Sequence, residues 1–219
     1  MSRPHEQAKR REQDLRADFG SLVSHGRRVG DLAGKLALEI GWTRADAERV
    51  RLAGTIHDIG KLLVPEEILS TPGRLSDAEF ALVKLHPLLG YELFDGVPGV
   101  EDLRTALLHH HERIDGAGYP IGLAGPAIPP IARLLAVADA YDAMTSARVY
   151  RSSLSRYEAL RQLADGAGTQ FDASLVRAFV DIPPTSPEFV ILPRLSEDAV
   201  ALLRIARERL ARASVRRAA

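Results

Sequence analysis

The chain has 219 residues, 46% of them apolar, and its 29 Lys+Arg residues balance 29 Asp+Glu residues. This length and composition suit one substantial hydrophobic core, and the zero net charge excludes a global basic field that would recruit nucleic acid or a membrane. There is no cysteine, which excludes disulfides, thiolate metal sites and cysteine nucleophiles. The charged start has no apolar signal region and no stretch is long enough to span a bilayer, so we expect a cytoplasmic protein that binds neither DNA nor membrane.

Apolar residues recur at intervals of three and four through most of the chain, while period-2 runs are nearly absent, a pattern that predicts an all-α fold. Ser76 and Glu79 form the ends of a capping box, and Gly41 and Gly73 lie where helices should end. In chain order, helices are expected near residues 12–40, 44–60, 77–95, 100–113, 130–146, 156–166 and 173–181, which makes a bundle of about seven helices.

A segment rich in glycine and proline, Asp115–Pro130, separates the fourth and fifth expected helices, and its length favours a functional loop over a simple connection. After Ile182 the sequence becomes proline-rich, and an Arg-rich helix is expected from about 196 to 214, with a solvated basic face rather than a nucleic-acid patch. The expected organisation is an N-terminal charged segment (1–20), a main domain (21–182) and a C-terminal appendage of linker and helix (183–219).

Histidines and acidic residues gather inside or beside the expected helices. The set comprises His25, His57, Asp58, His86, His110, His111 and Asp139. A lone histidine on a helix is more often a core or surface residue than a ligand, but the joint pattern is much harder to dismiss. Asp139 follows an apolar run, where a buried carboxylate is costly unless it is paired or bound to metal. Imidazole and carboxylate ligands together suit Fe, Mn, Co, Ni or Zn in an open, catalytic site.

Two motifs carry a resemblance to a known family. The pentapeptide His57–Lys61, HDIGK, resembles the HD-plus-GK signature of HD-superfamily phosphohydrolases, and His110–Pro120, HHERIDGAGYP, resembles the HHExxDGxGYP signature of the HD-GYP subfamily. The similarity runs from about His25 to Val180 and includes Arg133 and the stretch from Arg148 to Arg151. It implies an HD-domain helical bundle with a long GYP loop, and a phosphodiesterase that hydrolyses cyclic di-GMP to linear pGpG and in some members onward to GMP.

The resemblance also implies a centre of two divalent metal ions, with Fe or Mn expected first and Co, Ni or Zn as alternatives. The first ion would be held by His25, His57, Asp58 and Asp139. The second would be held by His86, His110, His111 and the bridging Asp58. A hydroxide that bridges the ions would attack the phosphate. Ser21 stands where some members have a glutamate for a third metal, so two ions are the better expectation.

Other residues are candidates for substrate contacts. Lys61 lies a turn beyond Asp58 and is expected to neutralise phosphate charge or assist the leaving oxygen, with a surface lysine at a helix end as the weaker alternative. Arg148 and Arg151 are three residues apart at the family's phosphate-clamping positions, although two exposed arginines near a helix end fit nearly as well. Gly118 and Tyr119 lie in the GYP loop, where a purely structural role is as good an explanation for each residue alone.

Glu112 and Asp142 lie beside the expected ligands and could orient metal-bound imidazoles, while His5 and His109 are not expected to bind metal. A homodimer or a regulatory protein partner is compatible with this sequence, and no sensory domain is expected before His25. Three alternatives stay open: a phosphohydrolase acting on another nucleotide, a non-catalytic module that binds cyclic di-GMP or a protein, and a helical scaffold that binds no metal.

Overall fold

The computed structural model describes residues 4–71, 73–146, 153–182 and 195–218, and its side chains are described from Phe19 to Arg212 outside the same gaps. Within these ranges the chain is helical and contains no strand, and the one isolated bridge joins Ala167 to Phe171. The all-α prediction is therefore confirmed. None of the helices in the described ranges is long and apolar enough to cross a membrane.

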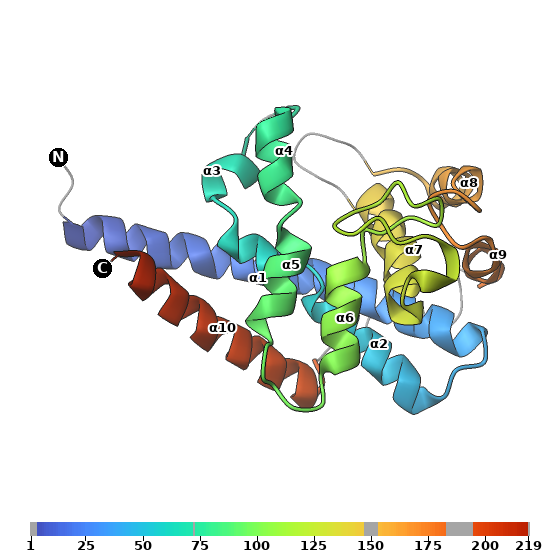
Figure 1. Cartoon of the computed structure of the whole chain (residues 1–219), viewed down its shortest axis with the longest axis horizontal. Coiled ribbons are helices and arrows are strands. Elements are labelled where there is room, and N and C mark those ends of the chain that lie inside the picture. The colour runs from blue at the N-terminus through green and yellow to red at the C-terminus, as the bar shows by residue number, and fades with distance from the viewer. Residues whose placement is uncertain (1–3, 72, 147–152, 183–194, 219) are drawn as a thin grey trace.

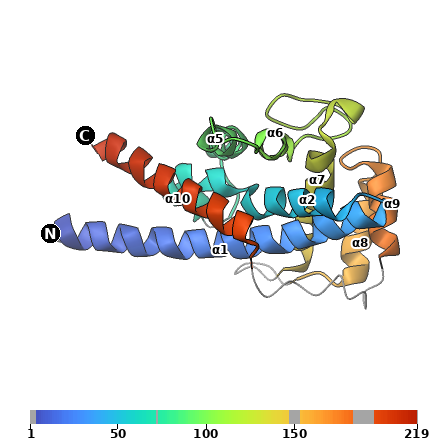
Figure 2. The ribbon, with the colours of Figure 1, turned by 90° about the horizontal axis from the view of Figure 1, so that it is seen from below.

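The long helix α1 forms one side of the molecule, and α10 runs back toward the end of the bundle at which α1 begins (Figure 1). Figure 2 shows α1 and α10 diverging toward the termini, while α8 and α9 cover the opposite end. The elements in order are α1 (Pro4–Glu39), α2 (Arg44–Ile56), the 3-10 helix η1 (Ile59–Leu63), α3 (Glu66–Leu69), α4 (Asp77–Val83), α5 (His86–Leu93), α6 (Glu101–His109), the 3-10 helix η2 (Gly125–Ala127), α7 (Pro130–Thr145), α8 (Arg156–Asp165), α9 (Ala173–Asp181) and α10 (Glu197–Ala218).

Three of the expected helices end differently in the structure. The helix expected at 77–95 is two helices, α4 and α5, because Pro87 lacks an N–H and occupies the first turn of a new helix. The helices expected at 44–60 and 100–113 end earlier, at Ile56 and His109. The capping box at Ser76 is confirmed, since its hydroxyl accepts from the Glu79 N–H and the Glu79 carboxylate accepts from the Ser76 N–H.

The two first helices cross at very short range, which positions the residues that follow them. A Cβ atom on Gly30 of α1 would lie 2.5 Å from the Arg51 carbonyl oxygen of α2, and one on Gly54 would lie 2.4 Å from the Gly30 Cα. Only glycine allows the backbones to approach so closely. Because the helices touch here, His25 on α1 and His57 at the end of α2 come into one site.

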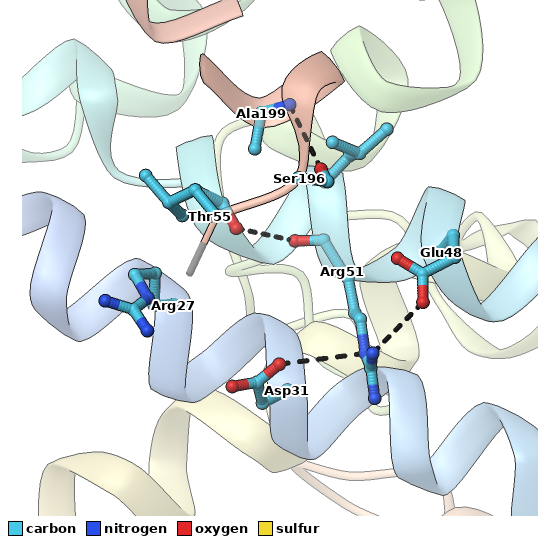
Figure 3. Close-up of a pocket in the computed structure, with 9 residues that line it drawn as sticks. Arg27, Asp31, Glu48, Arg51, Thr55, Ser196 and Ala199 are labelled. Carbon is cyan, nitrogen blue, oxygen red and sulfur yellow. Dashed lines mark hydrogen bonds and ion pairs between the residues drawn. The ribbon is translucent and has the colours of Figure 1, made fainter. Parts of the chain in front are cut away.

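Helix α10 packs on α2, α5 and η1, and its buried Leu202, Leu203 and Ala206 join the main core. Where its first turn meets α1 and α2, a pocket of about 40 Å³ is lined in part by Arg51, which bonds Glu48 (Figure 3). This small pocket is separate from the histidine cluster, because none of the described residues that line it is an expected metal ligand.

Candidate metal centre

The seven side chains expected to bind metal converge in the structure from α1, α7, the start of α5, and the turns that follow α2 and α6. Their potential ligand atoms form two groups, each lying within 4.8 Å of one another. The groups are Asp58, His86, His110 and His111, and His25, His57 and Asp58. Asp139 completes the second group, since its Oδ1 lies 3.1 Å from the Nε2 of His25 and 3.9 Å from that of His57.

Asp58 belongs to both groups, and its two carboxylate oxygens face different histidines. Oδ1 lies 3.2 Å from His86 Nε2 and 3.8 Å from His110 Nε2. Oδ2 lies 3.5 Å from His57 Nε2 and 3.7 Å from His25 Nε2. A carboxylate has two oxygens and can join two cations, which an imidazole at this position could not do. The geometry therefore offers two adjacent cation sites that share Asp58.

Three of the histidines are oriented by the C-terminal end of the helix that precedes them in the chain, α2, α4 or α6. The Nδ1 atoms of His57, His86 and His110 lie 2.6–2.7 Å from the carbonyl oxygens of Gly54, Val83 and Leu107, each three residues earlier. A carbonyl can only accept, so each Nδ1 carries the proton and each Nε2 presents a lone pair. These carbonyls have no partner within their helices, and the histidines satisfy them while turning Nε2 toward the shared carboxylate.

His25 is oriented by a carboxylate instead. Its Nδ1 lies 2.7 Å from Oδ2 of the buried Asp142, which also accepts from the Arg28 guanidinium at 2.6 and 3.0 Å. Asp142 therefore orients His25 as the sequence suggested, but Arg28, one helical turn from His25, was not predicted. The arginine compensates the charge of a carboxylate that would otherwise be costly to bury.

The protonation states suit a metal site. Burial lowers the pKa of His57 to about 4, and it also lowers the pKa values of His110 and His111, so these rings are neutral near pH 7. Burial also lowers the pKa of His25, but hydrogen bonds to Asp139 and Asp142 outweigh this effect and raise it to about 9. A cation placed between the rings and carboxylates would replace the proton held there, since ligand imidazoles bind metal in the neutral form.

Two buried atoms support the fit of metal ions to this site. Among the described residues, His57 Nε2 and Asp58 Oδ1 have no hydrogen-bond partner, although both are buried. An unpaired buried polar atom is costly, and both atoms face the centre of the cluster. The ligand atoms of the cluster are imidazole nitrogens and carboxylate oxygens, which suit borderline divalent cations. The cluster offers no thiolate for a closed structural zinc site. The residues present therefore fit two divalent ions.

Comparison with known proteins identifies the family. A family model described as the HD domain matches residues 12–175. The chain belongs to the HD domain family. The HHERIDGAGYP segment places it in the HD-GYP branch of this family, for which one structural neighbour described below is also named.

Several curated relatives of this HD-GYP chain are phosphodiesterases. A cyclic di-GMP phosphodiesterase of Pseudomonas aeruginosa is 49% identical over 130 residues, which are 59% of this chain and 31% of the relative. The cyclic di-GMP phosphodiesterase response regulator RpfG of Xanthomonas campestris is 39% identical over 155 residues, 70% of this chain and 41% of RpfG. A 3'3'-cGAMP-specific phosphodiesterase of Vibrio cholerae is 40% identical over 147 residues, 67% of this chain and 34% of that protein. The chain thus spans less than half the length of these relatives.

Two solved structures share the HD-GYP fold of this chain. An HDGYP protein from Bdellovibrio bacteriovorus has a TM-score of 0.58 at 26% identity, with 74% of this chain and 52% of that chain covered. A cyclic GMP-AMP-specific phosphodiesterase of Vibrio cholerae has a TM-score of 0.61 at 16% identity, with 85% of this chain and 54% of that chain covered. The second similarity concerns the fold alone.

Three of the residues expected to contact substrate, Lys61, Gly118 and Tyr119, lie beside the candidate metal centre. Lys61 on η1 donates to Asp58 Oδ2 at 2.5 Å. The Tyr119 ring lies 4.8 Å from the His111 ring, centroid to centroid, and its backbone N–H donates to the His111 carbonyl oxygen. A Cβ on Gly118 would lie 2.4 Å from the Arg113 nitrogen, so this position permits the close approach of the loop to the end of α6. The other two expected substrate residues, Arg148 and Arg151, lie outside the described residues.

Glu112 has a different role from the one expected. Its buried carboxylate does not bond a candidate ligand but accepts hydrogen bonds from the backbone N–H groups of Ile121, Gly122 and Leu123 at 2.8–3.1 Å. The nearest ring nitrogen that pairs with it is His109 Nδ1, at 3.5 Å. Glu112 therefore holds the part of the GYP loop at residues 121–123, because its carboxylate accepts hydrogen bonds from backbone N–H groups that the loop does not pair within itself.

Proposed function

We propose that the chain is a metal-dependent phosphodiesterase that hydrolyses cyclic di-GMP to linear pGpG, with GMP as the product of a second cleavage. The observation that carries the proposal is Asp58, whose two oxygens face different histidine groups. The names of the relatives support a cyclic dinucleotide substrate. The HD domain match from 12 to 175 supports a catalytic region close to the expected 21–182.

The candidate ligands would hold two metal ions. One ion would be held by His25, His57, Asp58 and Asp139, and the other by His86, His110, His111 and Asp58. We expect Fe or Mn, with Co, Ni or Zn as alternatives. When bound, such a pair of cations activates water and neutralises charge on the attacked phosphate.

Two further side chains would contact the phosphate. Lys61 Nζ, already beside Asp58, would donate to a phosphate oxygen and neutralise part of its charge. Burial raises the pKa of Tyr119, so its hydroxyl stays protonated near neutral pH and can donate a hydrogen bond. Arg148 and Arg151 would clamp a phosphate, as the family resemblance implies.

The test is an anaerobic assay of the purified chain with Mn²⁺ or Fe²⁺ and cyclic di-GMP, followed by chromatography of the products. We expect linear pGpG to appear first, and a His57→Ala/Asp58→Ala variant to lose turnover by at least about a hundredfold, because both cation sites lose ligands. If neither metal supports cleavage while cyclic di-GMP still binds, the chain is a binding module and the enzymatic proposal is wrong.

A second candidate substrate is 3'3'-cGAMP, because a relative named for that substrate is 40% identical over 67% of this chain. The same assay with both cyclic dinucleotides separates the candidates by the ratio of their kcat/KM values. A ratio above about ten in favour of cyclic di-GMP, equal to about 1.4 kcal/mol of transition-state discrimination, supports the first substrate.

A further inference from the structure

Next to the centre, Tyr119 meets two side chains that the proposed chemistry does not use, Phe80 and Lys84. We call Phe80, Lys84 and Tyr119 the aromatic corner. The Phe80 and Tyr119 rings lie 6.5 Å apart at an interplanar angle of 78°, and Lys84 Nζ lies 4.7 Å from the Phe80 centroid and 5.4 Å from the Tyr119 centroid. Phe80 and Lys84 are four residues apart, so they lie on the same face of the chain at the end of α4.

The aromatic corner does not belong to the hydrophobic core. None of the residues of α4, Asp77–Val83, all of which are described, is buried, and Phe80 is 44% exposed. Helix α4 makes its main contacts with α3 and stands out from the bundle in Figure 1. An exposed phenylalanine that faces a tyrosine and a lysine is therefore not explained by packing.

The corner begins one ring away from a candidate metal ligand. Tyr119 contacts both, with its ring 4.8 Å from the His111 ring and tilted by 31°, and 6.5 Å from the Phe80 ring. A base that extends from a phosphate at the cation sites on the α4 side would meet Tyr119 and then Phe80 with Lys84. The order from the centre outward is metal ligand, Tyr119, then Phe80 with Lys84.

Such a corner matches the chemistry of a nucleobase. A base has a flat π-face that stacks on aromatic side chains, and stacking of this kind tolerates an exposed site. The O6 and N7 atoms of guanine are acceptors, for which a lysine ammonium is a suitable donor. A phosphate alone would use the lysine but would gain nothing from the exposed phenyl ring.

We propose that the aromatic corner is a nucleobase subsite, in which a guanine of the substrate stacks on Phe80 and accepts a hydrogen bond from Lys84. This inference rests on the proposed function, because it places one base of the cyclic dinucleotide whose phosphate lies at the cation sites. It adds a specificity role to α4, which no metal ligand occupies.

Steady-state kinetics with cyclic di-GMP test the subsite. Phe80→Ala should raise KM by about 5- to 160-fold, the range that stacking of one base contributes, and leave kcat within about twofold, because the cation sites are untouched. Phe80→Tyr should restore the wild-type KM, since it restores a ring. Leu82→Ala is the matched control, because Leu82 is equally exposed at 43% on the same short helix. Loss of kcat with unchanged KM, or equal effects of Leu82→Ala and Phe80→Ala, overturns the proposal.

Equilibrium binding separates this inference from the proposed function. The metal-loaded wild-type chain should bind 5'-GMP more tightly than ribose 5-phosphate in calorimetric titrations, and Phe80→Ala and Lys84→Met should each reduce this ratio. If the wild-type chain cleaves no cyclic dinucleotide, the proposed function is wrong. The subsite is then tested by the ratio of the affinities for 5'-GMP and ribose 5-phosphate alone. If wild-type protein does not prefer GMP, or Phe80→Ala keeps the preference, the subsite does not exist.

Discussion

The contact between Asp142 and His25 leads to a quantitative prediction for Asp142→Asn. Four donors point at the carboxylate: His25 Nδ1 and Arg28 Nη2 toward Oδ2, and Arg28 Nε and Ser146 Oγ toward Oδ1. An asparagine has one acceptor oxygen, so its NH₂ group must face two of these donors in either orientation. If the NH₂ faces His25, the ring must take the other tautomer, which puts a proton on the Nε2 that would bind metal.

In the other orientation the amide oxygen faces His25 Nδ1 and accepts a weaker hydrogen bond than the carboxylate did. Arg28, whose side chain is 34% exposed, can then turn away from the NH₂ group to water. Because the two amide orientations harm the His25 ring to different degrees, we expect Asp142→Asn to lower the metal affinity by about 10- to 100-fold, equal to about 1.4–2.8 kcal/mol. Arg28→Met should have a smaller effect, since it leaves the carboxylate on His25.

The assay is a competition titration of the metal-free protein with Mn²⁺ and a chromophoric chelator, with thermal unfolding of the metal-free form as a check on folding. Glu112→Gln is the matched control, because Glu112 is also a buried carboxylate but bonds the loop and not a candidate ligand. Unchanged Mn²⁺ affinity in Asp142→Asn, or an equal loss in Glu112→Gln, would refute the role assigned to Asp142.

Three other predictions concern metal removal, the crossing of α1 and α2 at Gly30, and the buried carboxylate of Asp172. Removal of metal with a chelator should lower Tm by about 5–10 °C relative to protein at a free-metal concentration about a hundredfold above Kd, as measured by calorimetry, and readdition should reverse the loss. Gly30→Ala should lower the free energy of unfolding by about 1–3 kcal/mol in denaturant titrations, because the new Cβ would lie 2.5 Å from the Arg51 carbonyl oxygen. Gly20→Ala is the control and should not destabilise the protein, because the space around Gly20 is open. Burial raises the pKa of Asp172, but hydrogen bonds from Ser174 and then from Arg133 outweigh this effect and hold it below its ordinary 3.8. Asp172→Asn should therefore be less stable than wild type at pH 6, and the difference should vanish as pH falls through the folded-state pKa. A difference that persists at low pH contradicts the charge of the carboxylate as its cause.

The helical fold was accessible from sequence because burial of one face leaves a repeating trace in the chain. The segment 173–181 was predicted with the bounds that α9 has in the structure. Periodicity failed between α4 and α5, where apolar residues continue through Leu82 and Leu85 although both are exposed. Apolar residues on a projecting helix carry the same pattern as apolar residues in a core, so composition alone could not separate the two helices.

Two sequence signatures contain four of the expected ligands, His57, Asp58, His110 and His111, but no signature indicated the partners that orient the ligands. Asp142 and His25 are 117 positions apart, and nothing local in either segment indicates that they meet. Arg28 left only a weak signal, a basic residue one turn after a candidate ligand. Phe80 and Lys84 left none, because their relation to Tyr119 depends on how α4 lies against the GYP loop.

The errors at the helix ends and the geometry of the site have one physical origin. Periodicity predicted that helices would continue through His57 and His110, yet α2 and α6 end just before these residues. At each end the histidine Nδ1–H bonds a carbonyl three residues earlier, a group that a helix end leaves without an intrahelical partner. The helix end thus fixes the ring, the ring exposes Nε2, and Asp58 lies between the Nε2 atoms. A helix that continued as periodicity predicted would pair those carbonyls with backbone N–H groups, and neither imidazole would be held toward the shared carboxylate.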